Sequence, residues 1–415
     1  MAALGPIGGA PAGASSVPGA GSCPVLPSDN VWHADISGLP VNAHSAAWMG
    51  SMNAGSTRLH PDFGPSGEAM PYGIPYTVVP DSHGKVHPTF DYADESDQVP
   101  YPFGPDTPIE GGQQASGDRH ALMVDKDTCV LYELYDANWN NGQPTAGSGA
   151  VFDLRGDNLR PATWTSADAA GLPILPGLLR LDEVKAGHVD HAVRFTAQRT
   201  DRSYIWPARH QAGAANDANL PPMGARFRLK ASFDISRYRP DTQVILRAFK
   251  THGLMLADNG SNWFFQGTAE DGWDNGLLDE LKSVPASAFE AVDESSLMAD
   301  PNSARVKGAP APGPGGGGAG GGTTGTTNRT RTTSAARPGT ATTTALAPTT
   351  LAPPTTMLTT TTTTTERPAA GGATASARPA GGTARHSNAP WVALAVLLIG
   401  TVGTSAAFLT RRRRQ

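Results

Sequence analysis

Short runs of alternating apolar and polar residues, separated by Pro and Gly, fill the chain between residues 23 and 296. Residues 120–124 and 129–135 are two such runs on either side of the polar stretch DKDT, a pattern that predicts a β-hairpin. Residues 188–198 and 224–235 alternate with a period of two, as half-buried strands do. This part of the chain is therefore predicted to consist mostly of strands.

Three shorter stretches show helical periodicity instead. In residues 240–253 the apolar side chains share one face, and Gly253 suits the C-terminal cap. Residues 274–284 and 45–52 predict two further short helices. Many strands and few helices predict a mainly β fold, with one β-rich extracellular domain over residues 23–296 that forms a sandwich or an irregular barrel.

The pattern changes beyond residue 296. Residues 308–389 contain no aromatic residue and are dominated by Gly, Ala, Pro and Thr, so they lack the apolar surface that offsets the conformational entropy of folding. We therefore expect a disordered stalk over residues 297–389. Trp391–Thr410 follows as 20 residues without a charge, which is long enough to span a bilayer as a helix. This predicts one transmembrane helix over residues 390–410.

The arginines near the C-terminus predict the orientation. Residues 411–415 carry four of them and belong in the cytoplasm by the positive-inside rule, which places the β-rich domain outside the cell. The sequence thus predicts a single-pass protein of the cell membrane. Residues 1–22 are of low complexity and have neither the basic n-region nor the apolar h-region of a signal peptide. Because export requires a signal, we expect the true start to lie upstream.

Charge is divided unevenly along the chain and disfavours one class of partner. Residues 297–415 hold 12 Lys and Arg and 2 Asp and Glu; subtracting these from totals of 32 and 37 leaves 20 against 35, or −15, in residues 1–296. So acidic a domain argues against nucleic acid as a partner, because phosphates require a basic surface. The two cysteines, Cys23 and Cys129, are either one disulfide or two free thiols, and both options stay open.

Four stretches of the domain resemble known proteins. They read CPVLPSDNVWHADISGLPV, SGAVFDLRGDNLRPATWTSADAAGLPILPGLLRLDEV, HAVRFTAQRTDRSYIWPARHQAG and GLMLADNGSNWFFQG. Together they are similar to a family of secreted proteins of actinobacteria and other soil bacteria, over nearly all of residues 23–295. The resemblance implies an exported setting. It implies no reaction, so candidate chemistry has to come from the residues themselves.

The stretch WTSADAAGLPILPGLLRLDEV, residues 164–184, is the first candidate for a site. Its small residues and prolines suit either a loop shaped around a ligand or a compact crossover between strands. Its carboxylates suggest an acid–base site. In this hypothesis Asp168 or Glu183 is the general acid or base, and His191 or His210 positions the substrate or stabilises charge.

A second set of residues suits a glycan ligand, because tryptophan faces stack on sugar rings and polar side chains bind hydroxyl groups. The sequence has no Gly-x-Ser-x-Gly elbow, phosphate-binding loop or dinucleotide fingerprint, and we predict neither a metal site nor a particular cofactor. The predicted ligand-binding residues are Trp164, Trp206, Arg209, Asp258, Asn259 and Trp263.

Three functional hypotheses follow for such a surface protein. The leading one is a domain that binds carbohydrate or another wall or environmental polymer. The alternative is a polysaccharide-active hydrolase or lyase that uses carboxylate and histidine residues. The third is a structural or adhesive surface protein whose aromatic residues are simply core.

Overall fold

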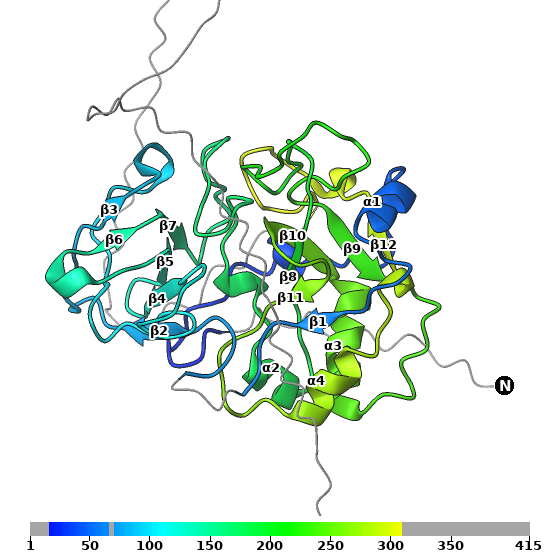
Figure 1. Ribbon diagram of the computed structural model, residues 1–415, viewed down its shortest axis with the longest axis horizontal. Helices are drawn as coiled ribbons and strands as arrows, with labels where there is room; N and C mark the ends of the chain where they lie inside the picture. Colours follow the sequence, from blue (N-terminus) through cyan, green and yellow to red (C-terminus); the bar gives the residue numbers. More distant parts are fainter. Residues whose placement is uncertain (1–15, 66–69, 309–415) are drawn as a thin grey trace, which may run out of the picture. The chain divides into compact units, whose positions relative to one another are not determined.

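The computed structural model describes residues 16–65 and 70–308 (Figure 1). Most of the predicted stalk, the predicted transmembrane helix and the arginine tail lie outside these residues. Within the described ranges, no helix is long and apolar enough to cross a membrane. The described part is mainly β with a few short helices, as the hydrophobic pattern predicts.

The larger sheet has six strands and occupies the right-hand part of Figure 1. Its central strands β8 and β10 are parallel, whereas the neighbouring pairs β11–β8, β10–β9 and β9–β12 are antiparallel. In spatial order the strands are β1 (His60–Pro61), β11 (Phe264–Phe265), β8 (Val193–Ala197), β10 (Leu254–Asn259), β9 (Arg226–Leu229) and β12 (Phe289–Val292).

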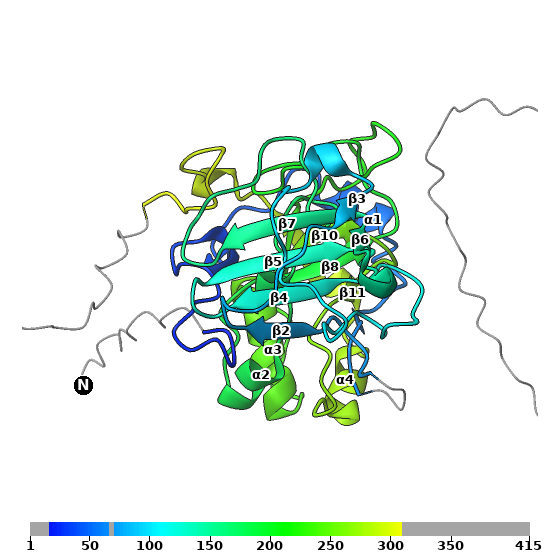
Figure 2. The same ribbon diagram turned by 90° about the vertical axis from the view of Figure 1, so that its left-hand side faces the viewer.

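The smaller sheet has four strands and lies in front of β8, β10 and β11 in the view of Figure 2. The predicted hairpin is confirmed, because β4 and β5 pair antiparallel from Ala121 opposite Leu134 to Asp125 opposite Val130. A short parallel pair, β3 (Thr89–Phe90) and β6 (Thr145–Ala146), lies beside it. In spatial order the four strands are β2 (Tyr76–Val79), β4 (Ala121–Asp125), β5 (Val130–Tyr135) and β7 (Ser148–Asp153).

The three short helices predicted within the β-rich domain are present, as α1 (Ser45–Ser51), α3 (Pro240–Thr251) and α4 (Asn275–Leu281). Helix α3 starts with Pro240, buries its apolar face and ends just before Gly253, whose φ of 73° favours glycine. The unpredicted helix is α2 (Leu181–Ala186). Short 3-10 turns occur at Val31–His33, Ala93–Glu95, Asn140–Gly142, Leu175–Gly177, Ala286–Ala288 and Ser295–Leu297.

The half-buried strand predicted over residues 188–198 is wrong in two respects. Strand β8 begins only at Val193, and all five of its residues are buried, so the two faces do not alternate in exposure. The physical reason is its central position, with β10 and β11 on either side and protein packed on both faces. A charged residue within this strand, Arg194, is therefore also buried.

The fold extends beyond both predicted boundaries. Ser16 pairs with Pro24 before the expected start, and Arg305 pairs with Asn30 after the expected end. Residues 297–308, which were assigned to the stalk, thus belong to the folded domain. Of the two options for the cysteines, the structure has the disulfide, which joins Cys23 to Cys129 at the start of β5.

Candidate functional site

The stretch at residues 164–179 is a crossover that runs from the four-stranded sheet to the six-stranded sheet. The backbone N–H groups of Ile174 and Leu175 donate to the Glu133 carboxylate of β5, and Ala170 N–H donates to Ala257 O of β10. Glu133 is fully buried, and burial raises its pKa to about 7. The crossover starts without a helical turn. Its backbone is held instead by the Glu133 carboxylate of the four-stranded sheet and by Ala257 O of the six-stranded sheet.

Asp168 lies in this crossover and is completely buried. Its two carboxylate oxygens accept hydrogen bonds from Arg194 of β8, from Nε at 2.8 Å and from Nη2 at 2.7 Å. Burial lowers the pKa of Arg194, but the charge and hydrogen bonds of Asp168, together with the charges of Asp258 and Glu110, outweigh burial and raise that pKa above the usual value. A carboxylate held in such a bidentate pair is a structural anion rather than the general acid or base expected from the sequence.

Asp258 lies beside this pair and is reachable from solvent. It is in β10, directly after a register shift that follows Leu256, and such irregularities redirect side chains. Its Oδ2 atom is 3.8 Å from Arg194 Nη2, and 22% of its side chain is exposed. Burial, and then the charge of Asp168, raise the pKa of Asp258 to about 8. The charge of Arg194 opposes this rise, and on balance the Asp258 carboxyl keeps its proton to a higher pH than an ordinary aspartate does.

His120 and Glu110 approach the same place from the four-stranded sheet. His120 precedes β4, its Nδ1 atom is 2.6 Å from Glu110 Oε2, and its Nε2 atom is 3.2 Å from Ala167 O. Because both neighbours accept hydrogen bonds, both ring nitrogens donate, which is the imidazolium form. Burial opposes this charge, but Glu110 raises the pKa of His120 to about 9. Burial raises the pKa of Glu110, but the charge and hydrogen bonds of His120, together with the charge of Arg194, reverse that effect and lower the pKa.

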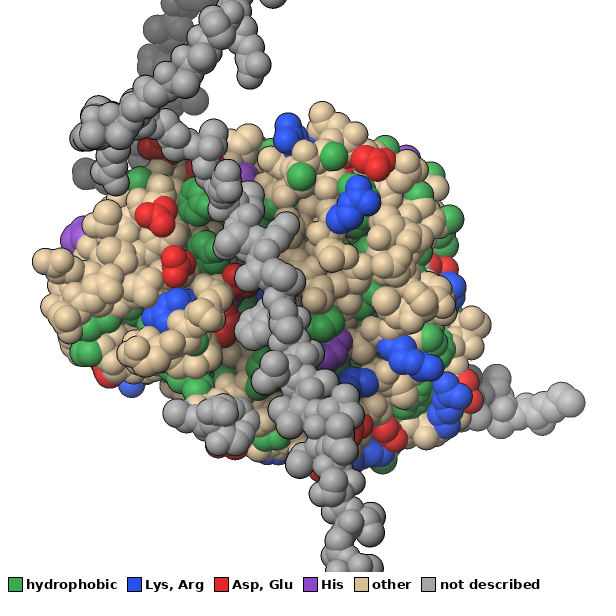
Figure 3. Space-filling model, viewed as in Figure 1, with side chains coloured by type: hydrophobic (Ala, Val, Ile, Leu, Met, Phe, Trp, Pro, Cys, Tyr) green, Lys and Arg blue, Asp and Glu red, His purple; other side chains and the backbone are tan. Residues whose placement is uncertain are grey.

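These five residues form the intersheet cluster, which consists of Glu110, His120, Asp168, Arg194 and Asp258. Solvent reaches it through Asp258 and through Glu110, whose side chain is 30% exposed. In Figure 3 several acidic side chains (red) lie on the left-hand half of the molecule, which holds β2–β7 in Figure 1.

Two further groups flank the cluster. Asp118 is exposed two residues before His120, and its charge contributes to the raised pKa of Asp258. Tyr135, at the end of β5, has its ring centroid 6.0 Å from that of His120. Burial, together with Asp118, raises the pKa of Tyr135 to about 12, so its hydroxyl remains a hydrogen-bond donor.

Glu183 and His191 lie in a different network, sealed from solvent. Glu183, in the first turn of α2, accepts a hydrogen bond from Arg180, and its Oε2 atom is 3.0 Å from His191 Nε2. The three side chains are 0–3% exposed. The structure therefore does not bring the four residues of the acid–base hypothesis into one network. Helix α2, which the sequence pattern did not predict, is what positions Glu183.

His210, Arg209 and Asn259 hold the loops around the crossover. His210 donates from Nδ1 to Ala169 O at 2.8 Å, and Arg209 donates from Nε to Arg160 O at 2.7 Å. Asn259 accepts from Thr200 Oγ1 and donates to Ala212 O. Their polar atoms thus bind the protein itself.

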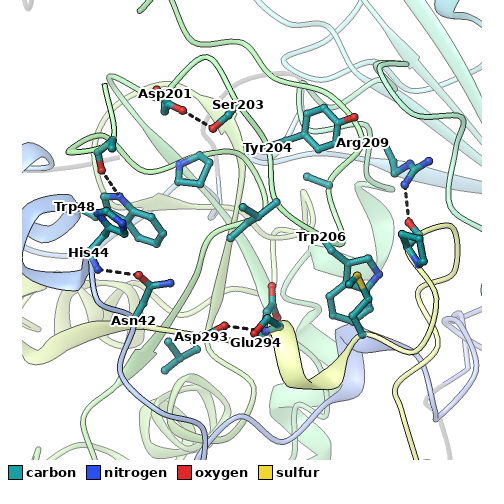
Figure 4. Close-up of a pocket in the computed structure, with 18 of the residues that line it drawn as sticks. Asn42, His44, Trp48, Asp201, Ser203, Tyr204, Trp206, Arg209, Asp293 and Glu294 are labelled. Atoms are coloured by element: carbon teal, nitrogen blue, oxygen red, sulfur yellow. Dashed lines mark hydrogen bonds between the residues drawn. The ribbon is translucent and has the colours of Figure 1, made fainter. Parts of the chain in front are cut away.

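The predicted tryptophans have three different environments. Trp263 is completely buried and donates from its indole nitrogen to Met52 O, so its predicted role in ligand binding is wrong. Trp164 is half-buried, with the Arg160 guanidinium 5.6 Å from its ring centroid. Trp206 is half-buried and lines a pocket of about 730 Å³ together with Trp48 and Tyr204 (Figure 4).

Four of the residues that matter most were absent from the predicted site: Glu110, Arg194, Glu133 and Asp118. Arg194 had a readable signal, since a lone charge inside an apolar strand needs a buried counter-ion. Within the described ranges, no group of three or more His, Cys, Asp or Glu side chains is arranged to hold a metal ion. Comparisons with protein-family models, curated proteins and solved structures give no match to this chain.

Proposed function

We propose that the protein is a carbohydrate-active enzyme, a glycoside hydrolase that uses Asp258 of the intersheet cluster as its general acid. The observation that carries this proposal is the position of Asp258, a partly exposed carboxyl group beside the buried Asp168–Arg194 pair, where burial and the charge of Asp168 raise its pKa. Hydrolysis of a glycosidic bond requires this combination, because one carboxyl must donate a proton while a second one is ionised.

The neighbouring residues have distinct parts in this proposal. Asp258 protonates the departing sugar oxygen, and the exposed carboxylate of Asp118 is the ionised partner that activates water or attacks the sugar. Arg194, fixed by Asp168, holds Asp258 in place. The positive charge of His120 is compensated by Glu110 at 2.6 Å.

The charges and rings around the cluster indicate the substrate class. Acidic groups outnumber basic ones here, which disfavours polyuronates and other anionic polymers and therefore also a lyase acting on them. Tyr135 lies next to the cluster. Tyr92, which is 49% exposed, is connected to it through Gly147, because Tyr92 N–H donates to Gly147 O and Gly147 N–H donates to Tyr135 O. Aromatic rings with accessible faces suit the apolar faces of neutral sugars.

The test is release of new reducing ends from a panel of neutral polysaccharides, namely β-glucan, mannan, xylan, arabinan and chitin. Wild-type protein is compared with Asp258→Asn and with the control Asp279→Asn, which changes a carboxylate whose side chain is 75% exposed. We expect cleavage by the wild type and the control, and a rate about 10²–10⁴-fold lower for Asp258→Asn. Equal rates for all three proteins would overturn the assignment of Asp258.

A second candidate function is glycan binding without cleavage, which the half-exposed Trp206 in its pocket favours. In that case a polysaccharide binds, no reducing ends appear, and Asp258→Asn leaves the affinity unchanged. Either function suits a domain displayed at the cell surface, which is the location that the predicted stalk and membrane helix indicate. Pull-down with the same insoluble polysaccharides separates the two candidates.

A further inference from the structure

The pocket beside Trp206 involves none of the five residues of the intersheet cluster. It has a volume of about 730 Å³, within the range of small-molecule sites, and an apolar lining interrupted by a few polar groups. Figure 4 shows His44 and Trp48 on one side, Trp206 on the opposite side, and Glu294 with Asp293 at the bottom. Residues far apart in the sequence thus meet around one space.

Glu294 is a pocket-lining carboxylate with one oxygen that lacks a hydrogen-bond partner within the described residues. Its side chain is 3% exposed, and its Oε2 atom is 3.4 Å from Arg226 Nη1. Its Oε1 atom has no hydrogen-bond partner within the described part of the chain. Burial raises the pKa of Glu294 to about 7, although Arg226 opposes the shift. A buried acceptor without a donor is costly, so a ligand that supplies a donor or a positive charge there is favoured.

Carboxylates outnumber arginines in the lining of the pocket. Asp201 and Asp293 line it together with Glu294, against one lining arginine, Arg209. The guanidinium of Arg209 donates to Arg160 O, Pro301 O and Asn302 Oδ1. Arg226, beneath the floor, likewise donates to backbone oxygens as well as to Glu294. The N–H groups of both arginines thus have acceptors within the protein, and the three lining carboxylates outnumber these two arginines by one.

The aromatic lining adds a second attraction for positive charge. Trp206 donates from its indole nitrogen to Ser303 O at 2.9 Å, which fixes the ring and leaves part of it exposed in the pocket. Tyr204, also half-buried, lies above it in Figure 4. Aromatic faces attract cations through their quadrupole, and a cation that is shielded from water gains the most.

We infer that this pocket is a binding site for an organic ammonium group attached to an apolar or sugar-like body. The lining carboxylates attract the ammonium group, and Glu294 compensates its positive charge. The rings of Trp206 and Tyr204 contact the rest of the ligand. Two sources share this chemistry: an amino-sugar residue of a polysaccharide and a free organic amine. The inference stands apart from the proposed hydrolase, because a binding pocket does not require catalysis by Asp258.

The experiment uses the full chain with Asp258→Asn, so that no probe is cleaved. Isothermal titration calorimetry compares the glucosamine tetramer with the N-acetylglucosamine tetramer, and phenethylammonium with 2-phenylethanol. We expect at least one ammonium probe to bind about 10-fold more tightly than its neutral partner, and the preferred pair identifies the source. No preference for either ammonium probe overturns the inference.

Variants locate the binding. Met298 lines the pocket and is 37% exposed, so Met298→Arg adds a positive charge at the rim with little risk to folding. It should weaken ammonium binding about 10-fold, whereas Met298→Leu should not. Glu294→Gln should remove the preference for the charged probe, provided that its unfolding curve shows a folded protein. Unchanged affinity in Met298→Arg would place the ammonium probe elsewhere and refute the site.

Discussion

Two charged networks in this molecule are built from the same kinds of residue and differ in their access to water. In the intersheet cluster, Asp258 and Glu110 are 22% and 30% exposed. In the network of Arg180, Glu183 and His191, every side chain is at most 3% exposed. A carboxylate near a histidine therefore indicates catalytic chemistry only where a substrate can reach it. Sealed pairs of the same composition connect elements of the fold.

The largest expected effect is on stability, in Asp168→Ala. This change leaves the buried Arg194 without its bidentate partner, and breaking a buried ion pair costs about 3–5 kcal/mol of unfolding free energy. Urea denaturation measures it, with Asp279→Asn as the exposed control. A loss below about 1 kcal/mol would show that Arg194 finds another partner. Loss of activity in Asp168→Ala therefore does not identify a catalytic residue.

Glu183→Gln tests the network that is sealed from solvent. It replaces the anion that Arg180 and His191 share but keeps the shape, so we expect about 2–3 kcal/mol of destabilisation. Per folded molecule, the rate of polysaccharide cleavage should stay unchanged. If the rate fell 100-fold in a protein that is fully folded by circular dichroism, the sealed network would have to take part in catalysis.

The third prediction concerns pH. The native pKa of Asp258 is about 8, against about 3.9 in an unfolded chain, so the native state retains a proton that the unfolded state loses between these values. Unfolding free energy therefore decreases as pH rises from about 4 to 8, by no more than about 1.4 kcal/mol per pH unit. His120, with a pKa of about 9, continues the decrease from about 6.5 to 9.

The rate of polysaccharide cleavage should depend on the same proton, that of the Asp258 carboxyl. A general acid must be protonated, so cleavage should decline as pH rises through about 8. Denaturation curves at a series of pH values, measured for wild type and Asp258→Asn, check the stability part. A pH dependence that is identical in both proteins contradicts the assignment, whereas a flatter curve below pH 6.5 in Asp258→Asn supports it.

The smallest expected effect is in Tyr92→Ala. Tyr92 is 49% exposed and is connected to Tyr135 through Gly147, outside both networks. Losing one stacking surface should raise KM about 2–10-fold, with kcat and stability nearly unchanged. Initial rates over a range of polysaccharide concentrations measure this. Tyr92→Phe is the matched control, because it keeps the ring and should restore the wild-type KM.

Local periodicity predicted much of the secondary structure. The helix over residues 240–253 and the hairpin at residues 120–135 formed as expected, because their caps, turns and apolar faces are local properties. Strand β8 did not follow its apparent alternation, since burial on both faces depends on what packs against it. The crossover of residues 164–179 was recognised as one of two options, and the structure uses it as a connection between the sheets.

The mainly β composition, three of the four α-helices in the described residues and the acidic character of the domain follow from the amino-acid sequence alone, because each depends on neighbouring residues or on simple counts. Which charged side chains lie close together, by contrast, depends on the tertiary structure. Asp168 and Arg194 lie 26 positions apart, and Glu110 of the loop before β4 lies far along the chain from Asp258 of β10. Whether a carboxylate is sealed like Glu183 or reachable like Asp258 depends on long-range packing, which is why the chemistry of the site emerges from the fold.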